Sequence, residues 1–214
     1  MSYVRVSILG SMTGGEVWSI NPVFDPTGEF PGGVDQNALD TAAAAIAALN
    51  PGGTLLGWLT TAASVTGARL EVRDDNSDGL IAISTQQRGT ALPGTGSPTK
   101  PAQIAGVFSI RTNTPGASGR GRVYWPAMGS SMGSDFRLNS PAVSTALAEF
   151  KTYMLAVRSA LAAAFPTIGF DLAVRSKAQQ ATPHAVRIQV GNVLDTQRRR
   201  RDNLPESYVQ VAFP

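Results

Sequence analysis

Four consecutive arginines, at positions 198 to 201, form the densest group of charged side chains in the sequence. A guanidinium group is a planar fork of donors that matches phosphate and carboxylate oxygens. Neighbouring like charges repel, and binding phosphates while releasing counterions relieves that repulsion. We therefore expect Arg198, Arg199, Arg200 and Arg201 to bind nucleic acid. The alternative is a solvated terminal patch, or a cluster that pairs with acidic groups of the chain or of a neighbour.

A second arginine pair, Arg120 and Arg122, follows a glycine-rich stretch that begins at Gly116. A phosphate-binding loop of the nucleotide-binding kind must open a helix. Here the residues after Arg122 are Val123 and Tyr124, which are typical of a strand. Nucleotide binding is therefore not expected, and we expect both arginines to face a polyanion or a neighbouring subunit.

Other chemistry is poorly supported. The chain has no cysteine and a single histidine, His184, with no nucleophile motif beside it. Residues 74–79 begin like a calcium-binding loop, but the twelfth position is Thr85 instead of a carboxylate, so a polar hairpin turn is favoured. We predict that the protein is not an enzyme and has no catalytic residue, metal site, cofactor or small-molecule substrate.

The composition favours assembly. Charged residues make up 15% of the chain, against about 25% in ordinary soluble domains. A surface so poor in charge is expected to lie largely against other copies of the chain, or to face water with Ser, Thr, Gln and backbone groups instead. The charge is also uneven: residues 1–107 carry five basic and nine acidic residues (−4), and residues 108–214 carry thirteen and six (+7). An arginine-dominated second part favours contact with a polyanion.

The pattern G-x-x-L-x-V-R occurs twice, starting at Gly67 and at Gly169, an offset of 102 residues. Around both copies the residues predict a hairpin, a helix and another hairpin. In the first part the helix follows Asp35, which is a good N-cap. In the second part the closing hairpin is expected from strands 168–176 and 184–191. The predicted fold class is α+β, with two similar hairpin-helix-hairpin halves and helices on one face of antiparallel sheet. The alternative is a jelly-roll β-sandwich with inserted helices.

These elements divide the chain into four parts that we expect to form one compact unit. They are a first ββαββ half (1–87), a Pro/Gly linker (88–102), a second ββαββ half (103–197), and an Arg-rich turn with a C-terminal arm (198–214). The arm alternates like a strand and could pair with the edge of a neighbour's sheet.

Taken together, the low charge, the absence of catalytic motifs and the arginine clusters resemble the coat proteins of small non-enveloped viruses and phages. The residues that carry the resemblance are the run 198–201 and the strand 118–126. It implies a self-assembling, homo-oligomeric capsid subunit that packages genomic RNA or DNA. Many such proteins carry a basic N-terminal arm, whereas this sequence starts directly with a stretch that is expected to form a strand. A phage tail or connector protein and a non-viral nucleic-acid-binding module are the alternatives.

The resemblance also implies a location in the virion, with assembly inside the host cell. The first residues lack the layout of a signal peptide, and no apolar run is long enough to span a membrane. We therefore expect neither secretion through a signal peptide nor a membrane partner.

Overall fold

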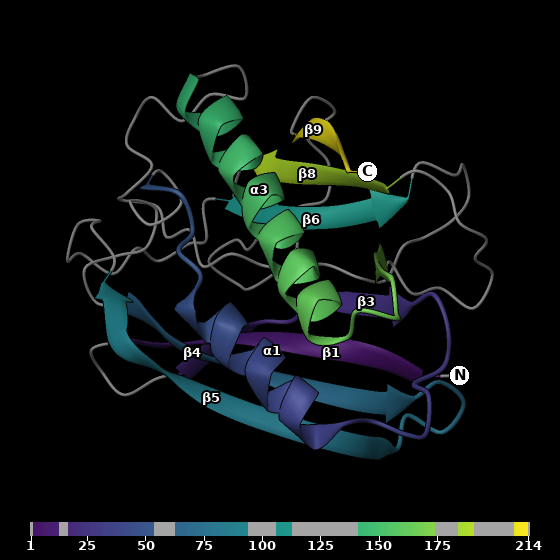
Figure 1. The fold of residues 1–214 in the computed structure, drawn as a ribbon. Coiled ribbons are helices and arrows are strands. Elements are labelled where there is room, and N and C mark those ends of the chain that lie inside the picture. Colours follow the sequence, from purple (N-terminus) through teal and green to yellow (C-terminus); the bar gives the residue numbers. More distant parts are fainter. Residues whose placement is uncertain are drawn as a thin grey trace.

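The computed structural model describes most of the first ninety residues and four later stretches. The described residues are 2–12, 17–53, 63–93, 106–112, 141–173, 184–190 and 208–213. They form two antiparallel sheets and two helices (Figure 1). The larger sheet contains β1 (Ser2–Met12), β2 (Val17–Ile20), β3 (Val23–Pro26), β4 (Ala63–Asp74), β5 (Leu80–Pro93) and β7 (Phe170–Ala173). The smaller sheet contains β6 (Gly106–Thr112), β8 (His184–Val190) and β9 (Tyr208–Phe213), and the helices are α1 (Gln36–Ala48) and α3 (Pro141–Ala164).

The larger sheet is built around the long strand β1. Its strand order is β5-β4-β1-β3-β7, and β2 pairs with the second part of β1, beyond the stretch that pairs with β3. Strand β4 pairs with β1 along nearly its whole length, from Ser2 opposite Asp74 to Met12 opposite Ala63. The predicted hairpins of the first half, β1–β2 and β4–β5, are both confirmed.

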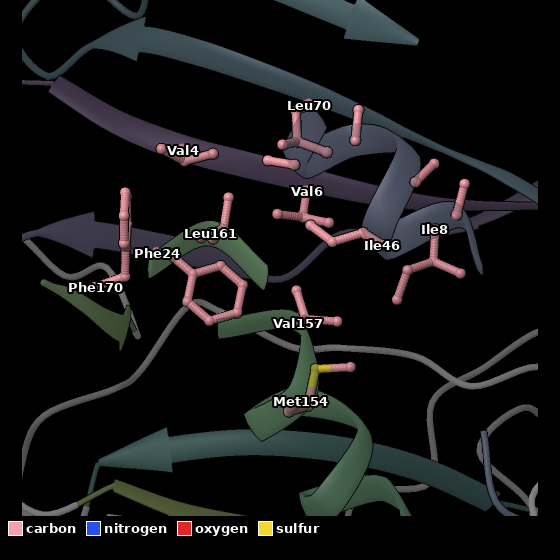
Figure 2. Close-up of a cluster of buried hydrophobic side chains, with 14 of the residues drawn as sticks. Val4, Val6, Ile8, Phe24, Ile46, Leu70, Met154, Val157, Leu161 and Phe170 are labelled. Carbon is pink, nitrogen blue, oxygen red and sulfur yellow. The ribbon is translucent and has the colours of Figure 1, made fainter. Parts of the chain in front are cut away.

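Both helices pack on the same face of this sheet, and the core lies between them and the strands (Figure 2). Because successive strand residues point to opposite faces, every second residue of β1 reaches this core: Val4, Val6 and Ile8. The helices contribute buried residues at helical spacing, among them Leu39, Ala42, Ala43, Ile46, Phe150, Met154, Val157 and Leu161. An α+β fold with helices on one face of antiparallel sheet is therefore confirmed. Helices cover the buried face of the larger sheet, whereas a β-sandwich would require a second sheet at that place.

Helix α1 is fixed at both ends by side chains. The carboxylate of Asp35 accepts hydrogen bonds from the backbone N–H groups of Asn37 and Ala38, as expected from its position before the helix. At the other end, Arg88 of β5 donates to the carbonyl oxygens of Ala47 (2.9 Å) and Leu49 (2.7 Å). A cation at a helix C-terminus satisfies carbonyl groups that have no partner within the helix and interacts favourably with the helix dipole.

The strand pairing of the second part differs from the prediction. The 102-residue offset requires β7 to pair with β6 and with β8, as β4 pairs with β1 and with β5. Instead, β7 pairs with β3 of the first part, and β8 pairs with β6 and β9. The predicted closing hairpin of strands 168–176 and 184–191 is therefore wrong for the described residues. Helix α3 contacts α1 and β7 at the larger sheet as well as β8 and β9 of the smaller one.

The two copies of the G-x-x-L-x-V-R pattern need glycine for different reasons. A Cβ atom on Gly67 would collide with the backbone carbonyl oxygen of Gln86, because β4 and β5 come close where their register shifts. A Cβ on Gly169 would lie 2.8 Å from Oγ1 of Thr27, whose hydroxyl accepts a hydrogen bond from the Gly169 N–H. The same letters therefore meet different neighbours, which explains why the repeat does not extend to the strand pairing.

Two predicted boundaries also change. Residues 88–93 of the expected linker belong to β5, where Leu92 and Pro93 pair with Val65 and Ser64 of β4. The C-terminal segment, expected as an arm for a neighbour's sheet, forms β9 and pairs with β8 of the same chain. Residues of the first half and residues 150–170 contribute to the same hydrophobic cluster.

Candidate nucleic-acid interface

The face of the larger sheet opposite the helices carries three arginines on two adjacent strands. Arg5 lies on β1 between the core residues Val4 and Val6 and therefore points away from the helices. On β4 the same alternation places Arg69, Glu71 and Arg73 on that face. No helix among the described residues covers it (Figure 1). We call this side the open face.

Strand register brings the three arginines to one carboxylate. Arg5 lies directly opposite Glu71, and its Nη1 is 3.6 Å from Glu71 Oε2. Arg73 Nε donates to the same oxygen at 2.7 Å. Arg69 forms a close ion pair with the other oxygen, Oε1. Glu71 therefore holds three guanidinium groups side by side.

Glu71 remains ionised in this setting. Its side chain is only 6% exposed, and burial by itself raises the pKa of a carboxyl group. The hydrogen bond from Arg73 and the positive charges of Arg69, Arg73 and Arg5 outweigh that effect and hold the pKa of Glu71 below its ordinary value of 4.5. The carboxylate is thus a fixed anchor at neutral pH.

The arginines differ in what they offer to a ligand. Arg73 is also engaged at the end of the β4–β5 hairpin, where its Nη1 donates to the carbonyl oxygen of Asp78 at 2.7 Å. Arg5 and Arg69 have 35% and 43% of their side chains exposed. Each guanidinium has five N–H donors, more than one carboxylate can accept. Arg5 and Arg69 can therefore bind a phosphate group while they stay anchored to Glu71.

The acidic turn at the end of the β4–β5 hairpin limits this basic surface on one side. The carboxylate of Asp74 accepts from the backbone N–H groups of Asn76 (3.1 Å) and Ser77 (2.8 Å) and from the hydroxyl of Ser77. The backbone hydrogen bond from Ser77 is the main cause that lowers the pKa of Asp74. The predicted polar hairpin turn is confirmed, and no group of three metal-ligating side chains occurs among the described residues.

The arginines singled out from the sequence are not placed by this structure. Arg120, Arg122, Arg198, Arg199, Arg200 and Arg201 all lie outside the described residues. His184 begins β8, opposite Thr112 of β6 and Phe213 of β9. The prediction that the six arginines bind nucleic acid stays a prediction.

Sequence reasoning missed the cluster on the open face. The alternation of arginine and glutamate along residues 69–73 shows that these side chains share a face of a strand. The sequence does not show which strand lies beside β4, and only the pairing of β1 with β4 places Arg5 opposite Glu71.

Comparisons of the chain with protein-family models, with curated proteins and with solved structures found no match. Within the described residues, no helix is both long enough and apolar enough to cross a membrane.

Proposed function

We propose that the chain is the self-assembling coat subunit of a small virus or phage and that its arginines hold the genome. The observation that carries the proposal is that the two faces of the larger sheet differ. One face is buried under α1 and α3, and the other presents Arg5, Arg69 and Arg73 with no described helix above them. A shell needs subunits whose two faces differ in this way, because one faces nucleic acid and the other does not.

Two further features support the proposal. The low share of charged residues is what a surface covered by copies of the same chain requires. The run at Arg198 to Arg201, together with Arg120 and Arg122, would add a second set of guanidinium groups to those of the open face. Arginine neutralises phosphates regardless of base sequence, which suits a protein that packages a whole genome.

Assembly is tested by expressing the full chain and imaging the purified product by electron microscopy, with its A260/A280 ratio measured. Closed shells that contain nucleic acid are expected. Rings or tubes would favour the tail or connector alternative. A monomer or dimer that binds nucleic acid without assembling would favour the non-viral module. A product that stays small and free of nucleic acid in all buffers would contradict the proposal.

The role of the open face is tested by the salt dependence of binding to a single-stranded oligonucleotide. Replacing Arg5 and Arg69 by glutamine should weaken binding at low salt. It should also reduce the slope of log K against log salt by about 0.7 for each lost phosphate contact. Lys151→Gln, on the helix side of the sheet, is the matched control and should leave the slope unchanged. Equal slopes for the double variant and the wild type would show that the open face does not contact nucleic acid.

A further inference from the structure

The edge of the larger sheet at β5 is long, exposed and unusually apolar. Strand β5 covers fourteen residues and, among the described strands, pairs only with β4, so its other side forms the border of the described sheet (Figure 1). Leu80, Ile81 and Ile83 are 50%, 53% and 38% exposed, and they are the large hydrophobic residues that lie exposed in the described part of the chain. All three belong to this strand.

The usual protection of an edge strand is nearly absent here. Natural proteins blunt exposed edges with charged side chains, especially lysine, or with proline. Within residues 80–93 Arg88 is the single charged residue, and its guanidinium is bound to the C-terminus of α1. The single proline of the strand, Pro93, is its last residue. A second strand would therefore meet no repelling charge along this edge.

The backbone groups that a partner would need point outward. The carbonyl oxygen of Ile83 accepts a hydrogen bond from Nε2 of Gln36 at 3.0 Å, so this oxygen faces away from β4. Backbone groups in a strand alternate in direction. In the regular register that pairs Ile83 with Glu71 and Gln87 with Gly67, Thr85 and Gln87 present their N–H and C=O groups to the same side as Ile83. The side chain of Gln36 already binds one of these outward-facing backbone groups, the carbonyl oxygen of Ile83.

We infer that a second copy of this chain pairs along β5, antiparallel to it, in a register centred on Ile83. An antiparallel pair of identical strands is self-complementary about a two-fold axis, which is the commonest symmetry of homo-oligomers. With Ile83 opposite its own counterpart, Ile81 lies opposite Thr85 and Leu80 opposite Gln86. This register places all three exposed hydrophobic residues within the contact and leaves Arg88 outside it.

The pairing has a direct consequence for the open face. A two-fold axis that relates antiparallel edge strands of a continuous sheet is perpendicular to that sheet. The helices of both copies therefore stay on one side, and both sets of Arg5, Arg69 and Arg73 lie on the other. The inference rests on the proposed function in one respect: it supplies the first contact of a coat subunit and doubles its arginine surface.

The absence of cysteine allows a direct test, because a single introduced cysteine is the only thiol. Opposed residues in an antiparallel pair have Cα atoms about 4.5–5.5 Å apart, within the range of about 4.4–6.8 Å that a disulfide can bridge. Ile83→Cys should therefore form a covalent dimer on mild oxidation of the full chain. Gln87→Cys lies on the same edge but far from its counterpart, and Ala44→Cys lies on the exposed side of α1. Both controls should cross-link at least tenfold more slowly.

Two further variants test the pairing without a thiol. Thr85→Pro removes an N–H group that faces the edge, and proline is tolerated on edge strands in that position. The variant should keep the circular dichroism spectrum of the wild type but dissociate to a monomer in analytical ultracentrifugation. Gln36→Ala uncovers the carbonyl group of Ile83 and should strengthen association several-fold.

Failure of this inference is distinguishable from failure of the proposed function. A wild-type chain that remains monomeric at 100 µM or more, or an oligomer that persists in folded Thr85→Pro without cross-linking at Ile83→Cys, would overturn the pairing. A β5-paired dimer that neither forms particles nor binds an oligonucleotide at low salt would uphold the pairing and overturn the coat function. Shells that form although β5 is unpaired would uphold the coat function and overturn the pairing.

Discussion

Replacing Glu71 by glutamine is expected to destabilise the fold and at the same time to strengthen polyanion binding. The glutamine keeps the shape of the side chain and can still accept one hydrogen bond, but it removes the charge that holds Arg5, Arg69 and Arg73 together. The three guanidinium groups would then repel one another, and their donors would become available to phosphate. The arrangement therefore predicts opposite changes in stability and in polyanion binding for this one substitution.

The size of the stability effect follows from burial. Removing one partner of a buried ion pair costs about 3–5 kcal/mol because a buried charge loses its counter-charge. Here the remaining charges belong to arginines whose side chains are 20–43% exposed. Water can rehydrate them in part, so we expect a loss of about 2 kcal/mol in the free energy of unfolding, between the values for exposed and for buried pairs. Added salt should reduce the loss by screening the repulsion between the arginines.

The pH dependence of the stability difference tests whether the charge of Glu71 is its cause. The pKa of Glu71 is lower in the folded protein than its ordinary value. Its contribution to stability is therefore complete above the unfolded-state pKa, about 4.3, and is lost as the pH falls through the folded-state pKa. Urea unfolding of wild type and Glu71→Gln at several pH values should give the full difference at pH 7 and a shrinking difference below about pH 4.

The control is Glu29→Gln, because Glu29 is a solvent-exposed carboxylate; its unfolding free energy should stay within about 0.5 kcal/mol of the wild type. A difference between wild type and Glu71→Gln that is the same at pH 7 and pH 3 would refute the electrostatic account, because a packing defect does not titrate. Weaker oligonucleotide binding by Glu71→Gln would refute the view that the carboxylate competes with phosphate for the arginines.

Two other substitutions test the contacts that shape the sheet. Gly67→Ala should lower the free energy of unfolding by about 1–3 kcal/mol, because the added Cβ collides with the carbonyl oxygen of Gln86. Gly89→Ala, on the same hairpin with open space around it, should be neutral or slightly stabilising; equal effects of both in urea unfolding would contradict the steric explanation. Arg88→Ala should cost about 1.5–3 kcal/mol, the range for hydrogen bonds to charged groups, because the carbonyl oxygens of Ala47 and Leu49 lose their donor. Arg88→Lys keeps the charge but not the planar fork of donors, so its free energy of unfolding should lie between those of the wild type and Arg88→Ala. A lysine variant as unstable as the alanine variant would show that the charge at the helix end contributes nothing.

The elements that could be predicted from the sequence are those specified by near neighbours in the chain. Asp35 specifies the start of α1, Asp74 organises its own turn, and the alternation along β1 shows which residues face the hydrophobic core. The pairing of β7 with β3 could not be predicted in this way, because it joins residues about 150 positions apart. The 102-residue repeat misled for the same reason: Gly67 and Gly169 occupy equivalent places in a pattern of letters but contact unrelated backbone and side-chain atoms.

The candidate site shows the same limit. Alternation along β4 indicates that Arg69, Glu71 and Arg73 share a face, but a single strand does not reveal which neighbour supplies the third guanidinium. A run such as residues 198–201 is conspicuous because its members are adjacent in the chain. A cluster assembled across strands, such as the arginines that Glu71 holds in place, is not conspicuous in the sequence.

The geometry of the larger sheet separates the two activities that a coat subunit needs. Contacts between copies would use the backbone groups at the edge of β5, and contacts with nucleic acid would use the open face, where Arg5 and Arg69 are exposed and where Ile83 also lies because it pairs with Glu71. Since the two directions are perpendicular, neither contact has to displace the other, and a pair of copies presents its arginines on one continuous surface. Nucleic acid that spans both sets of arginines would therefore bind the pair more tightly than the single chain, and by linkage its binding would favour pairing along β5.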